Sequence, residues 1–320
     1  MITLNANIFL GALTNLIAYS QVANTTEAGI VGEFVNSFQD INVENGDGKV
    51  VLSSDLLTVN NYSGTSSVLT NTLPTVDEQY ISVENYKVIP LTINNYLMRG
   101  AFVEETQLAS FVAYLMSTMR ATMTAYLSDA LIAELEAYTP VQASQTETIN
   151  IFDTSSLLDP AQLTKAQTYN ANAIQEKLIT LIHSMGFPTD KYNDLQYKEI
   201  IDFSSMKFIV KNSTNGYMLV NSLATLLNSN KITDAEKWSK TYVIPDEQFS
   251  GTFDQSIVGW LMHNKKIQFG FFYEVATSFF DPSTLDTRNW LHFAYYLDTV
   301  NALPAVVIKV DATLTPTALT

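Results

Sequence analysis

Three histidines are the first residues to consider for catalysis. His183 lies in the segment His183-Ser184-Met185-Gly186, His263 stands shortly before Lys265-Lys266, and His292 falls in an alternating apolar run. None belongs to a His-Glu-x-x-His zinc motif, and the sequence holds no Gly-x-Ser-x-Gly elbow, Walker loop or dinucleotide-binding glycine pattern. Cysteine is absent, which excludes a thiolate nucleophile, a thiolate metal site and a disulfide scaffold. The sequence therefore predicts no enzyme, no catalytic residue and no cofactor or metal site.

Carboxylates offer two further kinds of site. The run from Asp40 to Val51 partly matches a calcium-binding loop, but its glycine is displaced by one position and Val51 stands where the bidentate glutamate belongs. We interpret this run as a turn. The acidic residues that a glycosidase could pair are Asp202, Asp246, Glu247, Asp281 and Asp286. Because the chain has 32 acidic residues, such pairs arise by chance.

Aromatic residues gather in the C-terminal part of the chain. They are Phe269, Phe271, Phe272, Tyr273, Phe279, Phe280, Trp290, Phe293, Tyr295 and Tyr296. A platform that stacks nucleic-acid bases would need basic residues beside it, and none accompany these rings. Packing in the core and at subunit interfaces is therefore the favoured interpretation.

The charge balance limits the partners. Of 320 residues, 17 are basic and 32 acidic, which gives a net charge of −15, and charged residues make up only 15 % of the chain. Phosphate contacts need Lys and Arg, so we expect no specific binding of nucleic acid, although DNA can lie nearby. A surface with few charges and many Asn, Ser and Thr residues tolerates close packing against other copies of the chain.

No apolar run approaches the ~20 residues that a membrane span needs. The nearest is 8–18, which leaves two alternatives: a signal segment cleaved near Gln21, or an N-terminal helix that packs on a neighbouring subunit through Phe9 and Leu13. No Lys or Arg precedes the run, and Thr14 and Asn15 interrupt it. We therefore favour the helix.

Hydrophobic periodicity predicts two long helices. Residues 104–138 contain no Gly or Pro and keep apolar residues at helical spacing, which gives one helix of about 50 Å. Asp159 and Pro160 supply the N-cap and first residue of the second helix, 160–185, and Gly186 ends it. A short helix is predicted at 218–227.

The strands complete an α+β pattern. Predicted strands cover 49–52, 79–88, 146–152, 206–210, 242–244, 271–280, 289–297 and 305–310. A hairpin is expected to pair 260–262 with 267–269. Strands 49–52 and 79–88, with the polar stretch between them, form an arm over residues 45–90. An isolated hairpin is only marginally stable in water, so we expect this arm to lie on a partner. The expected contact residues on the arm are Tyr62, Ser63, Gly64, Tyr80, Tyr86 and Lys87.

The order of these elements resembles the Hong Kong 97 (HK-97-like) fold of tailed-bacteriophage major capsid proteins. The resemblance is closest to small short-tailed phages and rests on 207–212 (KFIVKN) leading to 219–224 (LVNSLA), and on 290–296 (WLHFAYY) leading to 303–307 (LPAVV). It implies the following division: N-arm 1–44, extended E-loop hairpin 45–90, P domain 91–154 with the spine helix 104–138, A domain 155–270, and C-terminal strands 271–320 that return to the P domain and end in a tail.

The resemblance also implies a function. A major capsid protein self-assembles through pentamers and hexamers into an icosahedral shell around double-stranded DNA, here enclosed without specific binding. The implied partners are copies of the chain, a scaffolding protein, a portal and a decoration protein; the implied location is the virion, with assembly in the host cytoplasm and no membrane. Some relatives cross-link Lys to Asn between subunits, but no such pattern is present here. The alternatives are an encapsulin-type compartment shell, which would enclose enzyme cargo, and an exported Asn/Thr-rich surface or carbohydrate-binding protein.

Overall fold

The structure is a computed structural model of the chain. It describes residues 29–40, 48–57, 59, 73–83, 85–94, 105–154, 157, 159–213 and 240–314. The chain divides into two compact units. Unit 1 comprises Met1–Lys49, Tyr80–Glu134 and Ile267–Asp298, and unit 2 comprises Val50–Gln79, Leu135–Lys266 and Thr299–Thr320.

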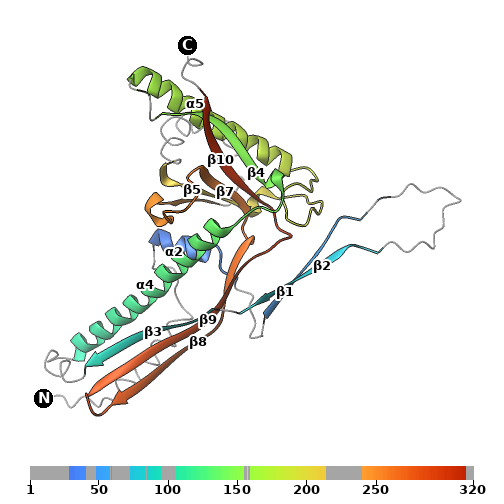
Figure 1. The fold of residues 1–320 in the computed structure, drawn as a ribbon. Coiled ribbons are helices and arrows are strands. Elements are labelled where there is room, and N and C mark those ends of the chain that lie inside the picture. The colour runs from blue at the N-terminus through green and yellow to red at the C-terminus, as the bar shows by residue number, and fades with distance from the viewer. Residues whose placement is uncertain are drawn as a thin grey trace. The chain divides into compact units, whose positions relative to one another are not determined.

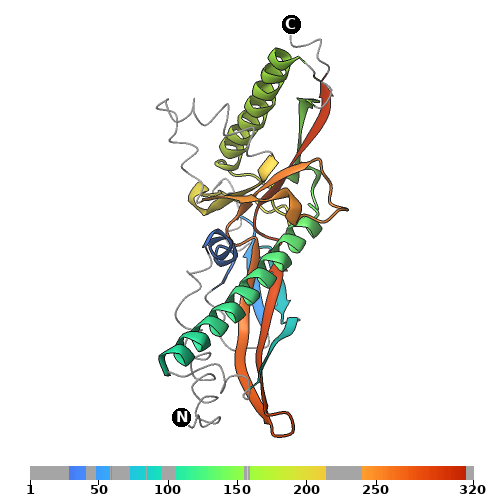
Figure 2. The ribbon, with the colours of Figure 1, turned by 90° about the vertical axis from the view of Figure 1, so that its left-hand side faces the viewer.

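Unit 1 is built on a three-stranded sheet and the long helix. The sheet has the order β3 (Asn85–Asn94), β9 (Asp286–Thr299), β8 (Ile267–Asp281). The helix α4 (Glu105–Ala137), most of which belongs to unit 1, runs along one face of this sheet (Figure 2). The contact is aromatic: the Tyr126 ring centroid lies 6.2 Å from those of Phe293 and Tyr295, and the Tyr126 and Tyr295 hydroxyls are 3.0 Å apart. The short helix α2 (Gly29–Asn36) adds Phe34 to the buried residues of this unit.

Unit 2 is built on a five-stranded mixed sheet with one long helix beside it (Figure 1). Its strand order is β4 (Thr146–Phe152), β10 (Ala305–Leu314), β7 (Ile257–His263), β5 (Met206–Lys211), β6 (Lys240–Ile244). The helix α5 (Pro160–Met185) packs its apolar side against the sheet, and Ile174, Leu178 and Leu181 are buried there. The short 3-10 helices of the described chain are Ala143–Gln145, Phe203–Ser205 and Asp246–Gln248.

Local polar contacts fix the helix α5 and the sheet edge that it covers. The Asp159 carboxylate accepts a hydrogen bond from the Ala161 backbone N–H at 3.0 Å, as an N-cap should. Asn170, in the middle of α5, bonds both the N–H and the carbonyl of Phe152 in the edge strand β4, at 2.8 and 2.9 Å. An edge strand whose peptide groups are already bonded is less able to recruit another strand.

The two remaining strands of the described chain form a narrow ribbon. β1 (Gly48–Ser54) and β2 (Val76–Ser82) pair with each other alone in a two-stranded sheet among the described residues (Figure 1). This ribbon is part of the predicted arm 45–90, whose last residues, Asn85–Pro90, belong instead to β3.

Several predicted elements are confirmed, and two are wrong. The helices at 104–138 and 160–185 and the strand at 146–152 occur as α4, α5 and β4. The predicted strand 79–88 is instead two strands, since β2 pairs with β1 while β3 pairs with β9. The predicted hairpin between 260–262 and 267–269 does not form, because both edges of β7 are occupied by β5 and β10 and the chain enters another sheet after Lys266. The predicted helices at 8–18 and 218–227 lie outside the described residues.

Candidate functional site

The three histidines do not form a catalytic group. His183 is exposed on α5, and His292 on β9 places Nε2 3.1 Å from the Thr277 hydroxyl. His263, at the end of β7, accepts a hydrogen bond at Nδ1 from the Lys265 N–H at 3.1 Å. Burial lowers the pKa of His263 to about 4, and the positive charge of nearby lysines acts in the same direction. His263 is therefore a neutral acceptor that shapes a turn.

The candidate carboxylates also serve local structure. Asp202 accepts hydrogen bonds from the Ser204 N–H and hydroxyl at 3.1 and 2.6 Å, and these bonds lower its pKa. Asp281 accepts in the same way from Ser283 at 3.0 and 2.6 Å, again with a lowered pKa. Such side-chain bonds two residues along the chain are typical of turns. Asp286 accepts from the Asn94 amide at 2.7 Å, which ties β9 to β3.

Asp40 and Lys49, from the run that partly matches a calcium-binding loop, form an ion pair. The Lys49 Nζ also donates to the Gln268 side chain at 2.7 Å. The Tyr296 hydroxyl donates to the same Asp40 carboxylate at 3.2 Å, and burial and this carboxylate raise the pKa of Tyr296. Among the described residues, no group of three or more His, Cys, Asp and Glu side chains could hold a metal ion.

The arm carries a row of exposed apolar side chains. Along β1 and β2 the even-numbered residues from 50 to 54 and from 76 to 80 are exposed, and Leu52 is 68 % exposed and Tyr80 58 % exposed. Further exposed apolar residues on the described part of the arm are Val50, Leu56, Leu57, Val59, Leu73 and Val76. We call this set the arm row. Many exposed apolar side chains close together in one segment of a single chain point to an interaction site.

Among the described residues, several contacts attach the arm to other parts of its own chain. Ile81 in β2 is buried, and the Asp55 carboxylate accepts from the Lys198 N–H at 2.9 Å. The Gln79 side chain donates to the Thr299 carbonyl at 2.7 Å and accepts from the Asn301 N–H at 2.9 Å. These bonds hold the arm while leaving the arm row exposed.

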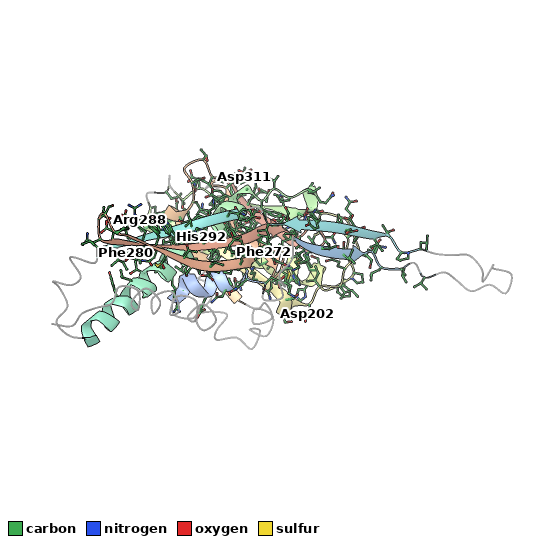
Figure 3. The ribbon with its side chains drawn as sticks, turned by 90° about the horizontal axis from the view of Figure 1, so that it is seen from below. Asp202, Phe272, Phe280, Arg288, His292 and Asp311 are labelled. Carbon is green, nitrogen blue, oxygen red and sulfur yellow. The ribbon has the colours of Figure 1, made fainter. Side chains whose placement is uncertain are left out.

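A second exposed apolar surface lies on the three-stranded sheet of unit 1. Register places Tyr86 opposite Ala294 and Val88 opposite His292, on the face opposite the α4 side of the sheet. On β8 the hydrogen bond between Thr277 and His292 places Thr277 on this same face, together with the exposed residues that alternate with it, Tyr273, Val275 and Phe279. Its exposed apolar residues are Tyr86, Val88, Tyr273, Val275 and Phe279, and we call it the open face. Figure 3 shows Arg288 and His292 of β9 beside Phe272 and Phe280 of β8 along this sheet.

The predicted contact residues do not share one surface. Tyr80 belongs to the arm row and Tyr86 to the open face. Lys87 is also exposed, with its Nζ 5.7 Å from the centre of the Tyr126 ring. Phe9, Leu13, Tyr62, Ser63 and Gly64 lie outside the described residues.

Sequence reasoning missed the open face as a surface. It assigned the aromatic residues to core and interface packing together, and the structure separates them: Phe269, Phe293, Tyr295 and Tyr296 are buried, while Tyr273 and Phe279 are exposed. The available signal was the alternation at 273, 275, 277 and 279, where no charged residue interrupts the series.

Comparison with known proteins identifies the family. The model of the Phi29-like phage major capsid protein family matches residues 12–309. The chain belongs to this family. It is therefore a phage major capsid protein, a building block of the capsid shell found in the virion, and the encapsulin-type and exported alternatives are not favoured. No curated protein matches the sequence.

Solved structures show the same fold. A chain from the capsid of Staphylococcus phage Andhra has a TM-score of 0.62 at 11 % identity, with 86 % of this chain and 83 % of that chain covered. A chain of native bacteriophage P68, from a structure of its head fiber and inner core protein, gives 0.57 at 12 % identity, covering 85 % and 82 %. The capsid of cyanophage P-SCSP1u gives 0.52 at 10 % identity, covering 87 % of each chain. The fold is thus the α+β, HK-97-like capsid fold that the sequence predicts. Within the described part of the chain, no helix has the length and apolar character of a membrane span.

Proposed function

We propose that this capsid protein builds its shell by seating the arm row of one copy on the open face of a neighbouring copy, around the five-fold and six-fold axes of pentamers and hexamers. The observation that carries the proposal is the row of exposed apolar side chains on the arm, of which Leu52 is the most exposed in the β1 strand. Contacts between different surfaces of identical chains close into rings when the rotation allows it.

The two surfaces match in chemistry. Both are apolar with few charges: Glu78 is the charged residue on the same exposed side of β2 as Val76 and Tyr80, and Arg288 is the charged residue of β9 beside the open face. Arg288 is already paired with Asp281 at 3.2 Å. Obligate contacts between subunits commonly bury more than ~2,000 Å² and resemble a domain core cut in half. Two apolar surfaces on one small subunit are what such contacts require.

The remaining predicted contacts extend this proposal. Tyr86 lies on the open face near the start of β3, where an incoming arm would meet it. Lys87 lies on the α4 side of the same strand, and we propose it as a contact at the edge of the sheet. We also propose Phe9 and Leu13 as contacts of the N-arm, and Tyr62, Ser63 and Gly64 as contacts of the arm tip. The division into N-arm 1–44, E-loop 45–90, P domain 91–154, A domain 155–270 and C-terminal strands 271–320 belongs to the same proposal.

The shell would enclose DNA without binding it specifically. The net charge of −15 favours repulsion from phosphate, and a wall with strong affinity for DNA would hinder packaging and release. We propose assembly in the host cytoplasm, with a scaffolding protein, a portal and a decoration protein as further partners. The role is structural, and no chemistry of the described residues points to an enzyme.

Sedimentation with electron microscopy tests the proposal. Protein produced alone, or together with the other head proteins, should form large particles of uniform diameter. Residues 61–67 are polar or small apart from Tyr62. Deleting them should therefore leave a folded monomer and impair particle formation. A protein that stays monomeric under every assembly condition, or a deletion that unfolds the monomer, would contradict it.

A further inference from the structure

The last residue of unit 2 before the chain enters β8 is a fully buried lysine. Lys266 has 0 % exposure; its Nζ donates to the Asp194 carboxylate at 2.8 Å and lies 5.5 Å from the centre of the Tyr138 ring. Burial lowers the pKa of Lys266, and the charges of Asp194 and Glu199 act in the opposite direction. Lysine is almost never fully buried unless it is paired, so this position calls for an explanation.

Asp194 is itself held from several sides. Its other carboxylate oxygen accepts from the Gln145 side chain at 2.7 Å, and its backbone N–H donates to the Asn301 carbonyl at 3.1 Å. Gln145 is also fully buried, and its amide donates to the Tyr192 carbonyl at 3.1 Å. The Asp194 carboxylate is therefore held in position by hydrogen bonds that do not involve Lys266.

The segments that meet here lie next to the points where the chain passes between unit 2 and unit 1, and we call these points the exits of unit 2. The chain passes between the units after residues 49, 79, 134, 266 and 298. The Lys266 carbonyl accepts from the Val300 N–H at 2.7 Å, and Gln79 bonds both Thr299 and Asn301. Tyr138, which covers the ammonium group, follows the α4 exit by a few residues. Four of the five exits thus belong to one hydrogen-bonded cluster, all of it within unit 2.

We propose that Lys266 is a latch: its ammonium group, clamped by Asp194, holds the exits of unit 2 together as one rigid junction, and its removal frees these exits while the unit 2 core stays folded. The core between α5 and the sheet includes neither Lys266 nor Asp194, so the two can separate. This inference goes beyond the proposed function because it concerns a single copy and does not depend on assembly.

Hydrogen exchange on the unassembled full-length protein tests the latch. Lys266→Met removes the charge and keeps most of the side-chain volume. The matched control is Lys309→Met, since Lys309 pairs with Asp254 at the same 2.8 Å distance but both side chains are partly exposed. Amides of Asp194, Val300 and Asn301 should exchange at least about tenfold faster in Lys266→Met, because local opening, not global unfolding, limits their exchange.

The same experiment contains the outcomes that would overturn the proposal. Amides of the core strands, such as Val210 and Ile308, should keep their exchange rates in Lys266→Met, and all rates should hold in Lys309→Met. A second variant, Asp194→Asn, should reproduce the selective loss. The latch is refuted if the junction amides are unaffected, if core and junction amides accelerate together, or if neither variant folds, because the junction would then be inseparable from the core.

Discussion

Leu52 gives the sharpest test of how the arm is used. It lies on β1 in the arm row and keeps 68 % of its side chain exposed in the single chain. Full burial of a leucine side chain stabilises by roughly 1.5–3 kcal/mol relative to exposure, so roughly 1–2 kcal/mol is still available to Leu52 on contact with a neighbour. Leu52→Asn should forfeit this gain at every copy of the contact.

The expected result is a large effect on assembly and a small one on the monomer. A loss of roughly 1–2 kcal/mol corresponds to a factor of about 5–30 in an equilibrium constant. The protein concentration at which half of the chains are in particles should rise by that factor. The free energy of unfolding of the monomer should change by no more than ~0.5 kcal/mol, as at other exposed positions. Sedimentation across a concentration series measures the first quantity, and urea unfolding the second.

The control for Leu52 is its neighbour on the opposite face of β1. Ser53→Asn introduces the same side chain into the same strand, and it therefore carries the same penalty for asparagine in a strand. It should assemble at nearly the wild-type concentration. The reasoning fails if the two variants assemble alike, or if Leu52→Asn destabilises the monomer as much as it weakens assembly.

Three further predictions concern the body of the subunit. Asp159→Ala should lower the free energy of unfolding by roughly 0.5–2 kcal/mol, because the N-cap of α5 loses its acceptor, and chemical denaturation of the monomer measures it. Gly259→Ala should cost roughly 1–3 kcal/mol or more in the same assay, since the added Cβ would lie 2.6 Å from the Ile209 carbonyl oxygen. Burial raises the pKa of Glu199 from 4.5 to about 7, so its contribution to stability is present below pH 4.5 and is lost as the pH rises through about 7. As the pH rises from 4.5 to about 7, the free energy of unfolding of the wild type should therefore fall relative to that of Glu199→Gln. Melting temperatures of the two proteins that change in parallel with pH would contradict this.

The sequence predicts the elements whose signals are local. The helix α4 follows from a long run without Gly or Pro, and α5 from the sequence Asp159-Pro160 at one end and Gly186 at the other. The strand β4 was likewise predicted at its full length. These features depend on neighbouring residues, so periodicity and capping chemistry are enough to find them.

The sequence did not predict which strands pair with each other. The residues around β7 and β8 have the alternation and the turn of a hairpin, and the Lys266 N–H does donate to the His263 carbonyl at 2.9 Å. However, β5 and β10, which are distant in sequence, take both edges of β7. Likewise, nothing local marks the end of β2 as the point where the chain changes sheets. Strand partners are set by contacts across the whole fold, and a single sequence does not contain them.

The candidate surfaces show the same division. The arm and its need for a partner were predicted from polar composition and the weakness of an isolated hairpin, and the contact with a partner stays a prediction. The structure adds that the arm row is exposed in the single chain. The open face was not predicted, because alternation alone does not tell which side of a sheet a helix will cover. The buried position of Lys266 was missed for a related reason: a lysine next to another lysine at a turn is normally solvated.

A cryo-electron microscopy reconstruction of the assembled particle would show the contacts of the arm themselves. We expect Leu52 and Tyr80 of each copy to lie buried against the sheet of a neighbouring copy, near Tyr86 and Phe279. A reconstruction in which the arm folds back on its own chain, or stands in solvent with no neighbour in contact, would contradict it.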